Sequence, residues 1–157
     1  MLINNQLIGQ SFELELNLTA SPLARKEKND CVVKTFASAF QVPYEEAHEF
    51  IRVKFDRKNG QGTRGLAHQL QQWGDQKQTV INGYKVCDIP AFNFYKNKGR
   101  IVRRRMTVGS AIEKYPKGTY MVLVRRHAFT IKDGIVIGNF SDTRPKVRIE
   151  KLYRVGK

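Results

Sequence analysis

The spacing of hydrophobic and polar positions changes along the chain. Between residues 31 and 52 apolar side chains recur at helical spacing, which predicts one helix from Cys31 to about Gln41 and a second that starts after Pro43. Later in the chain the apolar residues fall in short runs, which predict strands at 119–124, 127–132, 135–138 and 147–155. Helices first and hairpin-connected strands later predict an α+β fold, with N-terminal helices packed on a C-terminal antiparallel β-sheet.

The Asp133-Gly134 pair is the strongest turn signal in the chain, because this dipeptide favours the two-residue β-hairpin. Other segments give weaker patterns. They predict a strand at 11–18, a polar loop at 25–30, a glycine-containing loop at 57–65, a short helix at 64–73, irregular structure with short strands at 78–98, and a helix at 108–115 capped by Thr107.

Length and composition limit the class of protein. A chain of 157 residues with 41% hydrophobic residues is expected to form a single domain over residues 1–157. No apolar run approaches the roughly 20 residues of a membrane span, and the first residues lack the pattern of a signal peptide, so we expect a cytoplasmic protein with no membrane partner. Two cysteines are too few for a disulfide scaffold or a structural zinc site. We expect neither a metal nor another cofactor.

The chain is strongly basic, with a net charge of +14 from 28 Lys and Arg against 14 Asp and Glu. Such a charge predicts affinity for polyanions. Many of the cations fall between residues 96 and 126, where a nucleic acid or an acidic protein is the expected partner. The candidate polyanion-binding residues are Arg100, Arg103, Arg104, Arg105, Arg125 and Arg126, with Phe94 and Tyr95 nearby for base stacking.

A cysteine and a histidine provide the candidate chemistry. Cys31 follows the polar Asn29-Asp30 pair and is expected in the first turn of its helix, where the helix dipole and unpaired N–H groups favour a thiolate. His127 begins a predicted strand and is the candidate general base and acid. The alternatives are a small buried cysteine and an exposed histidine beside two arginines. Asp30 would oppose the thiolate unless it points away or caps the helix.

A third group is needed to orient the imidazole. Pairing about Asp133-Gly134 places Asn139 level with His127 to within a residue, so Asn139 is the first choice and Asp142 the second. Asn29 and the N–H groups of the first helical turn are candidates for stabilising an oxyanion. The other histidines, His48 and His68, are expected at the surface, and Cys87 is expected in the core.

The Asn29-Asp30-Cys31 helix start, the second helix after Pro43 and the strands from Gly118 to Gly134 together resemble small papain-like cysteine peptidases of bacteriophage and bacterial genomes, which are related in layout to the bacteriocin-processing peptidases. The resemblance covers under half of the chain. It implies a papain-like fold, with Cys31 as nucleophile and His127 as base, and it implies a phage origin with function in the host-cell cytoplasm.

The expected function is therefore a thiol hydrolase, either a peptidase or an amide-bond acyl transferase, acting on a peptide or protein substrate, with an acidic substrate as one candidate. The alternative belongs to another class. It is a non-catalytic, basic nucleic-acid-binding protein, which includes the case of a papain-like fold without activity. No helix-turn-helix, zinc-finger or RNA-recognition pattern supports this alternative.

Overall fold

We describe a computed structural model of the chain. The structure describes residues 16, 18, 21–27, 29–58, 80–81, 83–125, 127–137 and 146–156. Its helices are α2 (Pro22–Lys26), α3 (Cys31–Phe40), α4 (Tyr44–Phe55) and α6 (Val108–Lys114). Its strands are β1 (Val80–Ile81), β2 (Tyr84–Ile89), β3 (Phe92–Asn97), β4 (Arg100–Arg105), β5 (Thr119–Val124), β6 (His127–Lys132), β7 (Ile135–Ile137) and β8 (Ile149–Gly156). The described chain is α+β, as the order of sequence patterns predicts.

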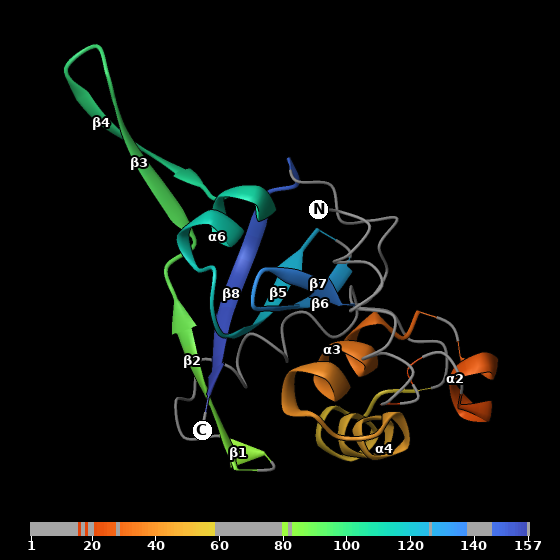
Figure 1. Cartoon of the computed structure of the whole chain (residues 1–157). Helices are drawn as coiled ribbons and strands as arrows, with labels where there is room; N and C mark the ends of the chain where they lie inside the picture. Colours follow the sequence, from red (N-terminus) through yellow and green to blue (C-terminus); the bar gives the residue numbers. More distant parts are fainter. Residues whose placement is uncertain are drawn as a thin grey trace.

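The strands form two antiparallel sheets of very different environment. The larger sheet has the order β1-β2-β8-β5-β6-β7, so the last strand of the chain lies between β2 and β5. Among the described strands, β3 and β4 pair only with each other, and they form a two-stranded ribbon that projects away from the sheet and helices (Figure 1). We call this ribbon, residues 92–105 with its turn at Lys98 and Gly99, the β-arm.

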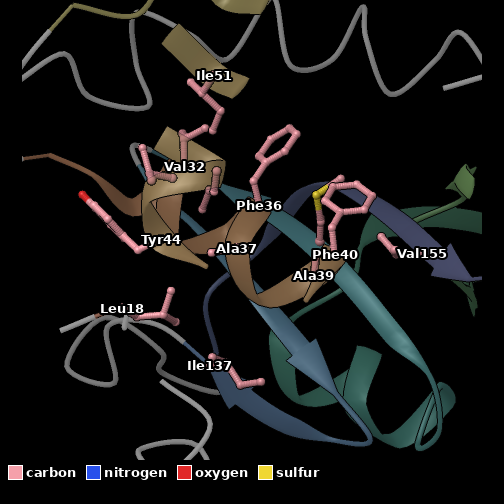
Figure 2. Packing of buried hydrophobic residues seen from close by; sticks show 14 of the residues in the cluster. Leu18, Val32, Phe36, Ala37, Ala39, Phe40, Tyr44, Ile51, Ile137 and Val155 are labelled. Carbon is pink, nitrogen blue, oxygen red and sulfur yellow. The ribbon is translucent and has the colours of Figure 1, made fainter. Parts of the chain in front are cut away.

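Two hydrophobic clusters cover the two faces of the larger sheet, because strand side chains alternate between faces. One cluster joins α3 and α4 to one face, through sheet residues such as Met121, Leu123 and Ala128. The other joins α6 to the opposite face, through residues such as Val122 and Phe129. Figure 2 shows the first cluster gathered around α3. Of the two helices on this face, α3 is therefore the one that lies directly on the sheet.

α3 forms where the sequence predicts it. The apolar residues at helical spacing are all buried, namely Val32, Val33, Phe36, Ala37 and Phe40. The helix ends at Gln41, whose left-handed φ of 55° stops the regular hydrogen bonding. α4 then follows Pro43, has two glutamates in its first turn as a helix dipole favours, and runs to Phe55, three residues beyond the expected end.

The Asp133-Gly134 turn is confirmed. Asp133 has φ 49° and Gly134 has φ 78°, the pair of positive values that a two-residue type I′ hairpin requires. The Asp133 carboxylate also accepts a hydrogen bond from the backbone N–H of Gly118 at 2.9 Å. This contact ties the β6–β7 turn to the start of β5. The predicted strands 119–124 and 127–132 have the bounds found for β5 and β6.

Other expectations need correction. Residues 25–30 are not a loop throughout, because α2 covers Pro22–Lys26 and its Ser21 side chain accepts from two backbone N–H groups. Within 78–98 the short strands expected around 80–81 and 84–86 are confirmed as β1 and the start of β2, but the segment is not otherwise irregular, since β2 runs on to Ile89 and β3 follows. The expected strand at 11–18 is described only at Leu16 and Leu18, both buried in turns, and the expected helix at 64–73 lies outside the described residues. The helix capped by Thr107 is confirmed as α6.

Within the described ranges, no helix has the length and apolar character needed to cross a membrane.

Candidate functional site

Cys31 is the first residue of α3 and is partly buried. At this position the backbone N–H groups of the first helical turn have no partner within the helix, so they and the helix dipole provide positive electrostatic potential around the side chain. The hydroxyl of Thr35, one turn later, donates to the carbonyl oxygen of Cys31 at 2.6 Å. The thiol therefore begins the helix that packs on the sheet, as the sequence predicts.

Asp30 occupies the N-cap position, but its side chain does not cap the helix. The carboxylate accepts a hydrogen bond of 2.8 Å from the hydroxyl of Tyr44, at the start of α4, and lies 3.6 Å from the ammonium of Lys34. Burial and the Asp30 carboxylate raise the pKa of Tyr44 well above its usual value, so the hydroxyl remains a donor. Of the two expected roles for Asp30, the structure shows the carboxylate engaged with α4.

We expect Tyr44→Phe to destabilise the protein by about 1–3 kcal/mol, because it leaves a buried carboxylate without one of its donors. The measurement is urea unfolding at pH 7. Tyr95→Phe provides a matched control, since Tyr95 is exposed on the β-arm and should unfold like the unchanged protein. Equal stability of the two variants would show that the Tyr44–Asp30 hydrogen bond contributes nothing.

Buried hydroxyls hold α3 against β6. The Thr130 hydroxyl on β6 donates to the carbonyl oxygen of Thr35 at 3.0 Å, and the Ser38 hydroxyl lies 2.7 Å from the Thr130 oxygen. Thr35, Ser38 and Thr130 are all buried. Because Thr35 and Ser38 are four and seven residues after Cys31, all three share one side of the helix. The side of α3 that carries Cys31 is thus the side that faces β6.

The beginning of α3 also lies beside the beginning of β6. Val32 and Ala128 line the same small apolar hollow, together with Leu123 of β5. Val32 directly follows Cys31 in the sequence, and Ala128 directly follows His127. From Val32 to Ser38 the residues of α3 therefore contact successively later residues of β6, so the two elements run in the same direction. The start of α3 and the start of β6 therefore lie side by side, but the His127 ring itself lies on the opposite face of the sheet, against Phe129.

His127 is the first residue of β6, and its Nε2 atom is buried. Its ring stacks on Phe129, with centroids 5.7 Å apart and planes inclined by 30°. Phe129 belongs to the cluster on the α6 face, whereas Ala128 and Thr130 face α3. Regular strand alternation thus directs the His127 side chain to the α6 face of the sheet, opposite the face on which α3 and Cys31 pack.

The remaining predicted site residues are described only in part. Asn29 is exposed, and its φ of 54° places it in the left-handed region, which asparagine tolerates well. Arg125 is exposed in the turn between β5 and β6. Asn139, Asp142 and Arg126 lie outside the described residues.

A buried charged cluster next to α3 was not predicted. Glu27 accepts a hydrogen bond of 3.2 Å from the Arg57 guanidinium, and its other carboxylate oxygen lies 2.9 Å from Nε2 of His48. The Glu27 and Arg57 side chains are only 4% and 2% exposed. The expectation that His48 lies at the surface is wrong, because its ring packs between α4 and the Glu27 carboxylate. These partners are 21 and 30 residues from Glu27, and no local pattern joins them.

Cys87 also departs from expectation. The sequence places it in the core, whereas the structure leaves it exposed on β2. Val86 takes the buried position instead, as alternation along a half-buried strand requires. Cys87 is accordingly a second accessible thiol and must be removed in any experiment on the Cys31 thiol.

Four of the predicted polyanion-binding residues occur together. Arg100, Arg103, Arg104 and Arg105 are on β4, all of whose residues are exposed. Two further cations of the basic segment, Lys96 and Lys98, lie on the same β-arm, while Lys114 and Lys117 are at the end of α6 and just after it. Most of the described cations between residues 96 and 126 are thus on the β-arm.

Comparisons with known proteins found no match, neither to a family model, nor to a curated protein, nor to a solved structure.

Proposed function

We propose that the chain is a papain-like thiol hydrolase or amide-bond acyl transferase that acts on a peptide or protein substrate. The observation that supports this most strongly is the position of Cys31. It starts a helix whose Cys31-bearing side packs on β6, and β6 itself starts at His127. A thiol at a helix N-terminus is a setting that activates a cysteine nucleophile, and the proposal further requires the His127 ring, which stacks on Phe129 on the α6 face, to reach that thiol.

In the proposed reaction His127 takes the thiol proton, and the Cys31 thiolate then attacks the substrate carbonyl carbon. The tetrahedral intermediate carries a negative oxygen, for which the first-turn N–H groups of α3 and the Asn29 side chain are the candidate donors. His127 then gives its proton to the leaving amine, and the acyl-enzyme forms. Attack by water on the acyl-enzyme completes hydrolysis, and attack by an amine completes transfer. The mechanism uses no cofactor.

Orientation of the imidazole is assigned to two groups. Phe129 stacks on the His127 ring and restricts its plane. Asn139 remains the first choice and Asp142 the second for the polar partner of the ring, because the sequence pairing about Asp133-Gly134 favours Asn139.

The test is the pH dependence of Cys31 alkylation by iodoacetamide, measured in a Cys87→Ser background. We expect fast alkylation at pH 6, where an ordinary thiol, with a pKa of about 8.5, is almost wholly protonated. His127→Ala should shift the rate profile toward that of an ordinary thiol, because the imidazolium no longer favours the thiolate. Alkylation that follows an ordinary thiol profile with and without His127 would refute the proposal.

A further inference from the structure

The β-arm is an unusual element for a chain of this size. Its strands pair from Phe92–Arg105 at the base to Asn97–Arg100 at the tip, and its turn residues Lys98 and Gly99 have the positive φ values of a type I′ hairpin. From Phe94 to Arg105 every residue is exposed. At about 3.3 Å per residue, six residues extend the arm by roughly 20 Å. Figure 1 shows it projecting beyond α6.

The charge of the β-arm has one sign on both of its faces. The arm carries six cations, and residues 89–112 contain no Asp or Glu. Register and alternation place Lys96, Arg103 and Arg105 on one face, and Arg100 and Arg104 on the other. An element that rests on a flat anionic surface needs cations on one face only. Cations on both faces suit a site with anionic groups on two sides.

Each face also exposes apolar side chains between its cations. Phe94 and Ile101 are 67% and 73% exposed on one face, and Tyr95 and Val102 pair with each other on the opposite face. Large apolar residues exposed in this way mark contact sites when they lie together. On the first face the guanidinium carbon of Arg103 lies 4.3 Å from the Phe92 ring centroid, so aromatic and cationic groups form one surface.

The base of the β-arm is anchored. Ala91 and Met106 are buried in the cluster on the α6 face, and the Met106 N–H donates to the Ala91 carbonyl at 2.8 Å. Met106 in turn accepts from the Ile149 N–H, and the Arg148 guanidinium donates to the Arg105 carbonyl. These contacts connect the β4 end of the arm to the start of β8, and the Met106–Ala91 hydrogen bond joins the β3 end to it. The arm is therefore held at a defined position on the sheet.

We propose that the β-arm binds double-stranded DNA by entering its major groove. The major groove of B-form DNA is about 12 Å wide and admits a two-stranded ribbon, with phosphates along both of its walls. Cations on the two faces would reach the two phosphate rows, and the apolar residues would contact base edges and thymine methyl groups. The site is separate from Cys31 and His127, so this proposal does not depend on the thiol chemistry.

The test is the anisotropy of a fluorescein-labelled 30-base-pair duplex titrated with the full-length protein at several NaCl concentrations. The arm variant is K96Q/R100Q/R104Q, and the charge-matched control is R25Q/K26Q/K54Q, whose positions are exposed on α2 and α4. We expect the arm variant to bind at least tenfold more weakly near ~0.1 M salt. Its slope of log affinity against log salt should fall by about 2–3, because each phosphate contact contributes about 0.9. The control should bind within about threefold of the unchanged protein.

Competition experiments identify the ligand. We expect unlabelled duplex to displace the probe at lower concentration than single-stranded DNA of the same length or heparin of equal charge, and a minor-groove ligand to leave the complex intact. Equal losses in the two triple variants, preference for single strands or heparin, or displacement by the minor-groove ligand would each overturn the proposal. Binding to anionic lipid vesicles without binding to duplex would also overturn it.

Discussion

Replacing Cys31 by Ala should abolish the burst of p-nitrophenol that p-nitrophenyl acetate releases from the Cys87→Ser protein. In that protein, with Cys31 present, we expect a burst of about one equivalent per chain. His127→Ala should retain the thiol and slow its acylation by about 10²–10⁴-fold, the usual contribution of a positioned general base. The first variant removes the atom that forms the acyl bond. The second removes only the group that takes its proton.

Two controls separate chemistry from folding. Cys87→Ser alone should keep the full burst, because the Cys87 side chain is exposed on β2 and Val86 takes the buried position there. Added imidazole should restore part of the rate in His127→Ala, which a misfolded protein would not allow. A burst that persists in Cys31→Ala, or an unchanged acylation rate in His127→Ala, would contradict the proposed mechanism.

The same assay distinguishes Asn139 from Asp142 as the residue that orients the His127 imidazole. Asn139→Ala should slow acylation by more than Asp142→Ala does, because the sequence pairing about Asp133-Gly134 favours Asn139 as the partner of His127. The opposite order would assign the role to Asp142.

Elements that depend on local chemistry were predictable from the sequence. The Asp133-Gly134 turn requires two residues that accept positive φ, and the sequence supplies both. Helix α3 is specified by its own apolar spacing, and α6 by Thr107, whose side chain accepts from the Ser110 N–H. The position of Cys31 at a helix start follows from the same local rules.

The β-arm was missed because it lacks the pattern by which strands are recognised. A half-buried strand alternates apolar and polar residues, but both faces of the arm meet solvent, so burial imposes no period of two on β4. The local clue was the Lys98-Gly99 pair, where a glycine supplies the second positive φ of the turn. The pairing itself is made by backbone hydrogen bonds, which leave little trace in side-chain hydropathy.

Contacts between distant segments were also beyond the sequence. In the sequence Thr130 is one polar residue in an apolar strand. Only the packed structure shows that its hydroxyl bonds to the Ser38 hydroxyl and the Thr35 carbonyl. The burial of Glu27 and the exposure of Cys87 likewise depend on which elements cover them. The sequence could therefore predict the ends of the elements that bear the site, but not the contacts that position them.

The burial of Glu27 leads to the largest expected effect on stability. We expect Glu27→Gln to lower the free energy of unfolding by about 3–5 kcal/mol, because it removes the countercharge of a guanidinium that is 2% exposed. The amide also cannot accept at both positions where the carboxylate oxygens meet Arg57 and His48.

Glu49→Gln is the matched control for this change. Glu49 pairs with Arg52 on the open surface of α4, and that guanidinium lowers the pKa of Glu49, yet both side chains are more than half exposed and solvent screens the pair. Urea unfolding should therefore give Glu49→Gln the same free energy of unfolding as the unchanged protein, and Glu27→Gln a much lower one.

Because Glu27 connects the end of α2 to α4, and Tyr44 of α4 holds Asp30 beside Cys31, Glu27→Gln should also slow Cys31 alkylation under conditions where the variant is still folded. Loss of stability with an unchanged alkylation rate would show that the charged cluster supports the fold but does not position the thiol.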